Sequence, residues 1–149
     1  MKVLLRKATQ ADKEFLRDLN RIVYKQLVIE QFGSWDDRWQ RNYFDEKWKG
    51  AAYQIILVED HPVGTFWTVE EKDHILVREI QVLPEFQGRR IGTTLMKRLL
   101  KNAKTRQLPV RLGLLKANRA RHFYERLGFR VYEETQNRLY MQNALHQRD

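Results

Sequence analysis

The chain has 149 residues, 42% of them apolar, which fits a single domain over residues 1–149 with its own hydrophobic core. Its 28 Lys and Arg exceed its 19 Asp and Glu, but they are spread along the chain, which favours a solvated surface over a nucleic-acid patch. The absence of cysteine excludes disulfides, zinc–thiolate sites and a cysteine nucleophile, and the lack of a long apolar run or signal peptide indicates a cytoplasmic protein with no membrane partner.

The first 50 residues predict one strand and two helices. A short strand over residues 3–7 leads to a helix capped by Thr9, where an acid three residues later completes a capping box. Gly33 should end this helix, and Ser34 should open a second one. The apolar stripe expected on the first helix consists of Phe15, Leu19, Ile22, Val23, Gln26 and Leu27.

The second helix carries aromatic residues at helical spacing. Trp35, Trp39 and Tyr43 follow one another at intervals of four, and Phe44 and Trp48 add to them. Such a stripe is usually part of a core, but it could also wall a substrate pocket, because exposed tryptophan is costly without a role. The sequence leaves both interpretations open.

The remainder of the chain predicts a mixed sheet. Short turns should join strands over 53–59, 63–70 and 75–83 into an antiparallel meander. A helix from Ile91 to about Gln107 should then lead to a strand that pairs in parallel with 75–83. The last expected elements are a strand over 110–115, a helix capped by Asn118 and ended by Gly128, strands over 129–134 and 138–142, and frayed final residues.

The link between strand 75–83 and the next helix contains two glycines and two arginines. Residues 87–92 read Gln-Gly-Arg-Arg-Ile-Gly and precede a helix, whose first backbone N–H groups attract anions. Glycine lets a ligand approach the backbone, and arginine adds forked donors. The loop therefore indicates a phosphate site, although a basic turn that only starts a helix would look the same.

This loop resembles the acetyl-CoA-binding motif of the GNAT N-acetyltransferase superfamily, Gln/Arg-x-x-Gly-x-Gly/Ala. Gln87 and Gly92 match its first and last positions, whereas Arg90 stands where the family most often has glycine. The resemblance implies an α/β fold, with a central, mostly antiparallel twisted sheet of about six to seven strands flanked by about four helices.

A second stretch, residues 118–129, resembles another signature of the same family. The matching residues are Asn118, Tyr124 and the pair Gly128-Phe129. As structure alone they could be a cap, a core aromatic and a helix stop. Both motifs together imply transfer of an acetyl group from acetyl-CoA to the primary amine of a small molecule or peptide. Because the chain has no cysteine, we expect direct transfer in a ternary complex, and we expect no metal.

The resemblance also implies catalytic roles. Glu79, on the strand before the loop, is the candidate base, although an ion pair with a neighbouring Lys or Arg would explain it equally well. The Val82 N–H would stabilise the tetrahedral oxyanion. Tyr124 would protonate the leaving thiolate, or else it is a half-buried core tyrosine.

The expected ligand contacts complete the prediction. The cofactor-binding residues would be Ile80, Gln81, Val82, Gln87, Gly88, Arg89, Arg90, Ile91, Gly92, Thr93, Asn118, Arg121 and Tyr124. The acceptor-binding residues would be Glu30, Trp35 and Asp36. Alternatives are a non-catalytic acyl-CoA sensor of the same fold and a basic nucleic-acid-binding domain, and the sequence leaves open whether the chain forms a homodimer.

Overall fold

The computed structural model describes residues 1–144, which contain seven strands and four α-helices. The strands are β1 Val3–Lys7, β2 Gln54–Val58, β3 His61–Glu70, β4 Ile75–Val82, β5 Val110–Leu115, β6 Phe129–Glu134 and β7 Arg138–Asn143. The helices are α1 Lys13–Phe32, α2 Asp37–Trp48, α3 Ile91–Thr105 and α4 Arg121–Arg126, and two short 3₁₀ turns cover Gln10–Asp12 and Pro84–Phe86.

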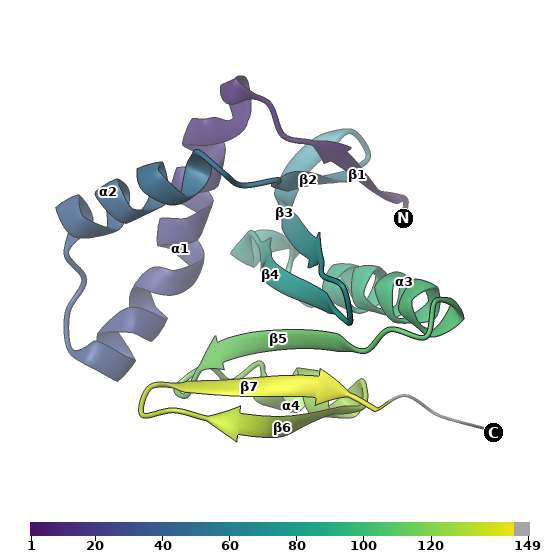
Figure 1. The fold of residues 1–149 in the computed structure, drawn as a ribbon. Helices are drawn as coiled ribbons and strands as arrows, with labels where there is room; N and C mark the ends of the chain where they lie inside the picture. Colours follow the sequence, from purple (N-terminus) through teal and green to yellow (C-terminus); the bar gives the residue numbers. More distant parts are fainter. Residues whose placement is uncertain (145–149) are drawn as a thin grey trace. The chain divides into compact units, whose positions relative to one another are not determined.

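The strands form one mixed sheet in the order β1-β2-β3-β4-β5-β7-β6 (Figure 1). β4 and β5 are parallel, with Ile75 opposite Val110, because α3 connects them as a crossover. β1 with β2, β2 with β3, β5 with β7 and β6 with β7 are antiparallel. The predicted fold class, with its mostly antiparallel sheet and four helices, is confirmed.

The chain divides into two compact units. The first unit comprises residues 1–67 and 79–92, and the second comprises residues 68–78 together with the chain from residue 93. Both β3 and β4 contribute residues to each unit. The frayed end predicted for the last residues, 145–149, lies outside the described part of the chain.

The first unit begins with a capped turn. Thr9 and Asp12 form the predicted capping box around the 3₁₀ turn, and Asp12 also binds Arg6 at 2.8 Å. The guanidinium of Arg6 lowers the pKa of Asp12 to about 2, and the backbone N–H of Thr9 adds to the effect. The turn delays the start of α1 to Lys13, later than the sequence predicts.

The apolar stripe predicted for α1 is only partly correct. Leu19 is fully buried as expected, but its buried partner is Leu16, which the stripe omits. Ile22 belongs to the predicted stripe but is 52% exposed. The buried face is thus rotated, because packing against the rest of the unit selects the face. Gly33 ends α1 with φ +94°, a left-handed conformation that favours glycine.

α2 begins at a different residue from the one predicted. Its N-cap is Asp36, whose side chain accepts a hydrogen bond from the Trp39 N–H at 3.0 Å, so the capping role expected of Ser34 is wrong. Trp35 therefore precedes the helix. Trp39 and Tyr43 remain at helical spacing and share a face, as predicted.

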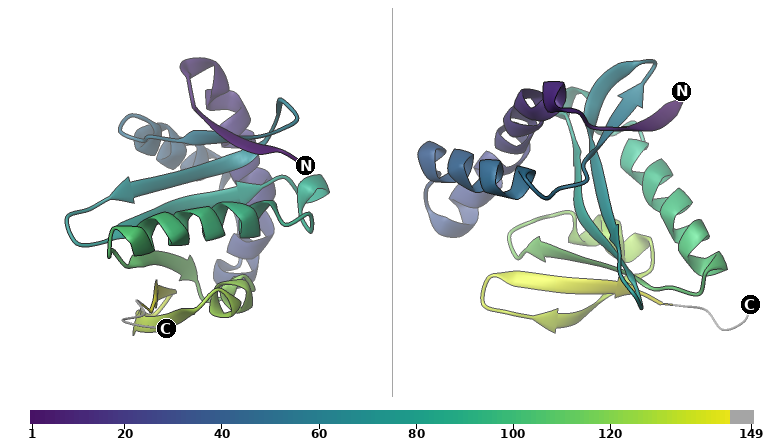
Figure 2. Two further views of the ribbon diagram at one scale, coloured as in Figure 1. Left: turned by 90° about the vertical axis from the view of Figure 1, so that its right-hand side faces the viewer. Right: turned by 45° about the horizontal axis from the view of Figure 1, so that its top comes forward.

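In the second unit, β5, β7 and β6 lie side by side (Figure 2). Its core contains Met96 from α3, Val110 from β5, Phe129 from β6 and Met141 from β7, all with no exposed surface. Gly128, with φ +98°, links α4 to β6 and is the helix stop that the sequence predicts.

Candidate active site

The loop over residues 87–92 belongs to the first unit; it follows β4 and includes the first two residues of α3, Ile91 and Gly92. A 3₁₀ turn over Pro84–Phe86 precedes it, and the Gln87 N–H bonds the Pro84 carbonyl at 3.1 Å. The Gln87 side chain returns to the strand, because its Nε2 donates to the Val82 carbonyl at 2.9 Å. Gln87 thus fixes the loop to the end of β4, a role separate from any ligand contact.

Two residues of this loop have left-handed backbone conformations. Gly88 has φ +79° and Arg90 has φ +64°, and α3 begins directly after Arg90. Arg90 therefore adopts the conformation for which glycine is the usual residue, at a cost of about 1–2 kcal/mol. The backbone path that a glycine would allow is kept in spite of the arginine side chain.

The loop is exposed and positively charged. Gln87, Gly88, Arg89 and Arg90 are all exposed, whereas the next residue, Ile91, is 2% exposed and anchors the start of α3. The Arg89 guanidinium lies 5.1 Å from the centre of the Phe86 ring. Open backbone N–H groups at a helix start, together with two arginines, suit a phosphate or pyrophosphate.

β3 approaches β4 unusually closely just before the loop. A Cβ on Gly64 would overlap the Gln81 carbonyl and lie 3.1 Å from the Val82 Cα. The glycine therefore lets the backbone at Gln81 and Val82 keep its place, which is where the sequence predicts the oxyanion donor and part of the cofactor-binding strand.

Glu79 on β4 is held by three side chains. Lys47 of α2 donates to its Oε2 at 3.0 Å, and the Gln81 amide donates to its Oε1 at 3.2 Å. The Tyr24 hydroxyl of α1 lies 3.4 Å from the same Oε1. The Glu79 side chain is 12% exposed. The predicted alternative of an ion pair is thus present, and the role of Glu79 as a base remains a prediction.

The second unit holds Asn118, Arg121 and Tyr124. Asn118 lies in a turn, where its Oδ1 accepts from the Ala120 N–H at 2.9 Å. Because α4 begins only at Arg121, with Ala120 at its N-cap, the predicted capping role of Asn118 is wrong. Arg121 pairs with Glu125 at 3.1 Å and is the main cause of that carboxyl's lowered pKa.

Tyr124 is mostly buried. It is 8% exposed, and its ring meets Phe123 and Phe129 edge-on at 5.1 and 5.8 Å between centroids. Tyr124 therefore makes the contacts expected of a core tyrosine, and its role as an acid remains a prediction. The other predicted cofactor residue of this unit is Thr93, in the first turn of α3.

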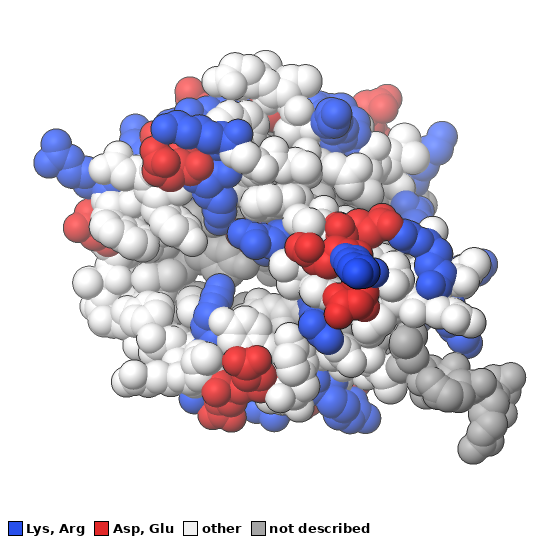
Figure 3. Space-filling view, in the orientation of Figure 1, with Lys and Arg blue, Asp and Glu red and all other residues white. Residues whose placement is uncertain are grey.

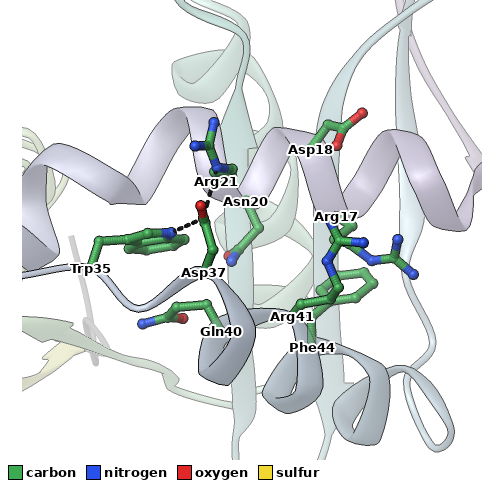
Figure 4. Close-up of a pocket in the computed structure, with 9 residues that line it drawn as sticks. All are labelled: Arg17, Asp18, Asn20, Arg21, Trp35, Asp37, Gln40, Arg41 and Phe44. Carbon is green, nitrogen blue, oxygen red and sulfur yellow. Dashed lines mark hydrogen bonds and ion pairs between the residues drawn. The ribbon is translucent and has the colours of Figure 1, made fainter.

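The predicted acceptor residues are not gathered in one place. Glu30 is exposed on α1, and Asp36 is exposed and occupied as the cap of α2. Trp35 lines a cavity of about 40 Å³, together with Arg17, Asp18, Asn20, Arg21, Asp37, Gln40, Arg41 and Phe44 (Figure 4). Glu30 and Asp36 do not line this cavity.

The carboxylate of Asp37 connects two other residues that line the cavity. Asp37 accepts from the Trp35 indole N–H at 2.6 Å and from Arg21 at 3.0 Å, as Figure 4 shows. Arg21 and then Trp35 lower the pKa of Asp37. Three arginines, Arg17, Arg21 and Arg41, contribute to the lining, of which Arg17 pairs with Asp45 at 3.1 Å.

The aromatic residues of α2 divide between core and surface. Phe44 is 2% exposed and lies next to the rings of Trp48 and Tyr53, which fits the core interpretation. Trp39 and Tyr43 are stacked on each other with centroids 5.2 Å apart but are 57% and 52% exposed. For these two residues the core interpretation is wrong.

Sequence reasoning missed the partners of Glu79. Tyr24 and Lys47 are separated from it by 55 and 32 residues, and no local pattern links them to β4. Asn20, which accepts from the Gln81 amide at 3.1 Å, was missed for the same reason. The helical spacing of Tyr43 and Lys47 was a partial signal, since it places both on one face of α2.

Figure 3 shows Lys and Arg interspersed with Asp and Glu on the face drawn. Within residues 1–144 there is no cluster of three or more His, Asp or Glu side chains suited to a metal ion. No helix in the same part of the chain has the length and apolar character needed to cross a membrane.

Comparison with known proteins gives one family match. Residues 50–131, more than half of the chain, match the model of the acetyltransferase (GNAT) domain. This segment contains β2 to β5, the loop over 87–92 and α4. A comparison with curated proteins finds no match.

Solved structures share the fold over nearly the whole chain. PaiA N-acetyltransferase from Thermoplasma acidophilum, in complex with coenzyme A, has a TM-score of 0.77 at 18% identity, covering 96% of this chain and 99% of that chain. Arabidopsis thaliana Naa50, in complex with the bisubstrate analogue CoA-Ac-MVNAL, has a TM-score of 0.67 at 18% sequence identity. The match covers 97% of this chain and 99% of that chain. The ribosomal-protein-S18-alanine N-acetyltransferase of Escherichia coli has a TM-score of 0.67 at 14% sequence identity. The match covers 99% of this chain and 97% of that chain.

Proposed function

The chain belongs to the family of GNAT acetyltransferase domains, and on that premise we propose that it transfers an acetyl group from acetyl-CoA to a primary amine. The observation that carries the proposal is the loop over residues 87–92. Its backbone is left-handed at Gly88 and Arg90 immediately before a 15-residue helix, and its arginines are exposed. The complex of PaiA with coenzyme A supports the same assignment by likeness of fold.

Acetyl-CoA would bind mainly through its phosphates and its pantetheine arm. The N–H groups of the loop and the first turn of α3 would surround the pyrophosphate, with Arg89 and Arg90 adding charge. Pantetheine would run beside β4 at Ile80 to Val82, like an added strand. Asn118 and Arg121 are proposed as further contacts of the cofactor.

The reaction would proceed in one ternary complex. The acceptor arrives as an ammonium, with a pKa of about 10 for a lysine-like amine, and gives a proton to the Glu79 carboxylate. The neutral nitrogen then attacks the thioester carbonyl, and the Val82 N–H stabilises the oxyanion. As the carbon–sulfur bond breaks, the Tyr124 hydroxyl gives its proton to the thiolate. The nitrogen loses its second proton, which returns through solvent to the Tyr124 phenolate, and Glu79 releases the first proton to solvent. The products are the acetylated amine and free coenzyme A.

The acceptor is proposed as a small molecule or peptide that carries a primary amine. The peptide class draws support from two relatives by fold, one an N-acetyltransferase of a ribosomal-protein alanine and the other bound to a peptide-like bisubstrate analogue. The exposed pair of Trp39 and Tyr43 beside Lys47 offers an aromatic surface that suits a cationic group.

A thiol-release assay tests the proposal. Acetyl-CoA is incubated with the protein and a panel of amines, polyamines, amino acids and peptides, and free thiol is measured. We expect release that depends on one class of amine and falls when the loop is altered. Stabilisation by coenzyme A without release across the panel would instead support an acyl-CoA sensor. Salt-sensitive binding of nucleic acid with no response to acetyl-CoA would support a nucleic-acid-binding domain.

A further inference from the structure

The surroundings of Glu79 have the chemistry of a binding site for a primary ammonium. The Glu79 side chain is 12% exposed, and its carboxylate lies 3.0 Å from the ammonium of Lys47, whose side chain is 18% exposed. The same ammonium lies 5.3 Å from the centre of the Tyr43 ring, and the Tyr24 hydroxyl meets the other oxygen of Glu79. One carboxylate and one aromatic face therefore lie near a single cationic nitrogen, and a hydroxyl contacts the other oxygen of the same carboxylate.

A carboxylate so poorly exposed requires a cation. Removing a charge from water costs several kcal/mol unless an opposite charge and hydrogen bonds replace the solvent. Among residues 1–144, the Glu79 oxygens accept hydrogen bonds from Lys47, Gln81 and Tyr24, and of these three only Lys47 carries a positive charge. A different ammonium that reached the same oxygens would satisfy Glu79 equally well.

The acceptor of the proposed reaction carries this same group. A primary alkylammonium and the end of a lysine side chain have the same charge and the same three N–H donors. If Glu79 accepts the acceptor's proton, then the acceptor nitrogen must come within hydrogen-bond reach of its carboxylate. Lys47 occupies this position in the structure, so the two ammonium groups compete.

The same helix face provides an entry path. Trp39, Tyr43 and Lys47 lie at intervals of four on α2, and the first two have stacked rings with more than half of each side chain exposed. Aromatic faces attract cations, so this stripe can guide an ammonium from solvent toward Glu79. Lys47, on its four-carbon stem, can then turn its ammonium out into solvent.

We propose that Glu79, Tyr24 and the Tyr43 ring form a binding site for a primary ammonium, which Lys47 fills when no acceptor is bound and vacates when one arrives. The proposal rests on the function proposed above and identifies Lys47 as a positioning residue that sets the affinity for the amine. Because Lys47 is tethered beside the site, its effective concentration there is high, and its removal should strengthen amine binding about tenfold or more.

Amine binding without acetyl-CoA provides the first test. The Kd of n-butylammonium chloride is measured by calorimetry at constant ionic strength for the wild type, Lys47→Met, Lys47→Arg and the matched control Lys49→Met. Lys49 lies just beyond α2, paired with exposed Glu46. We expect about tenfold tighter binding for Lys47→Met, wild-type affinity for Lys49→Met, and affinity no tighter than wild type for Lys47→Arg.

An unchanged affinity in folded Lys47→Met would overturn the proposal, as would an equal gain in Lys49→Met. Adding Glu79→Gln to Lys47→Met should abolish the gain. In turnover, Lys47→Met should lower the KM for the amine while kcat changes little, a split that a purely structural ion pair would not produce. Lys47→Arg should restore the wild-type KM.

The wild-type protein provides a test that does not depend on the folding of a variant. With ¹³C-labelled lysine, the Lys47 Cε signal is assigned by its loss in Lys47→Arg and followed as n-butylammonium is added. It should move to the position of an exposed lysine as the amine saturates the protein. A signal that stays fixed, or no amine binding at all, contradicts the proposal. Amine binding without thiol release would contradict the acetyltransferase function alone.

Discussion

Gly64 of β3 lies against the backbone of Gln81 on β4 so closely that no side chain fits between them. Gly64→Ala should therefore move the strand that ends at Val82, because the obstacle is backbone and not a flexible side chain. We expect a loss of about 1–3 kcal/mol in the free energy of unfolding. Denaturant unfolding measures it, with Gly50→Ala as a control, since a Cβ at Gly50 meets nothing within 4 Å. Equal stability of the two variants would contradict the close approach.

Two substitutions of Arg90 separate what the loop backbone contributes to coenzyme A binding from what the arginine side chain contributes. Arg90→Gly removes left-handed strain but adds unfolded-state entropy, so the net change in stability should stay below about 1 kcal/mol. It should also retain coenzyme A affinity, because the N–H remains in place. Arg90→Pro, which lacks the N–H and cannot adopt φ +64°, should lose that affinity.

Calorimetric titration with coenzyme A measures both variants, and Arg89→Ala serves as the control for loss of one loop charge. A fall in affinity in Arg90→Gly as large as in Arg90→Pro would show that the guanidinium, and not the backbone, binds the cofactor.

Much of this loop could be predicted from sequence because its signals are local. The positions of Gly88 and Gly92 and the apolar spacing from Ile91 define a turn and a helix start within a few residues. The helix stops at Gly33 and Gly128 are equally local, since each requires only a left-handed backbone at one position.

The contacts of Glu79 could not be predicted in this way. Its partners Tyr24 and Lys47 come from two helices that reach β4 only after the unit has folded. The start of α2 was placed wrongly because Ser34 and Asp36 are both good caps, and packing decides between them. The aromatic stripe was ambiguous because spacing shows which residues share a face, not whether that face is covered.

Glu79→Gln tests the candidate base. The amide keeps the shape of the side chain but cannot accept the proton of the acceptor, so kcat should fall about 10²–10⁴-fold. Coenzyme A affinity should change little. The acidic limb of the pH–rate profile should also shift relative to wild type. Glu85→Gln, in the exposed 3₁₀ turn, is the matched control. Wild-type kcat in Glu79→Gln would exclude the base role.

Tyr124→Phe tests the candidate acid. Phenylalanine preserves the ring contacts with Phe123 and Phe129, so the fold should tolerate it. Turnover should fall more than coenzyme A affinity, because only the leaving thiolate loses its proton donor. Tyr132→Phe, at an exposed position of β6, controls for loss of a phenol. Turnover that is equal in the two variants would leave Tyr124 a core residue only.

The Arg6–Asp12 pair predicts how stability depends on pH. The pKa of Asp12 is lowered to about 2, so the pair stabilises the fold fully above the ordinary aspartate pKa of about 3.9 and loses its effect as pH falls through 2. Because Arg6 is partly exposed, Asp12→Asn should cost only about 1 kcal/mol at neutral pH.

Unfolding curves from pH 7 to pH 2 measure this difference, with Glu133→Gln, at an exposed position of β6, as the control. A gap between wild type and Asp12→Asn that persists unchanged at pH 2 would refute the assignment.

The most direct measurement of the central claim follows both products of a reaction with ¹³C-acetyl-CoA. Mass spectrometry quantifies the labelled acetyl-amine, and a thiol reagent quantifies free coenzyme A. The account predicts that an accepted amine yields the two in equal amounts, without labelled protein as an intermediate. Coenzyme A released without labelled amine, or neither product with any amine of the panel, would contradict it.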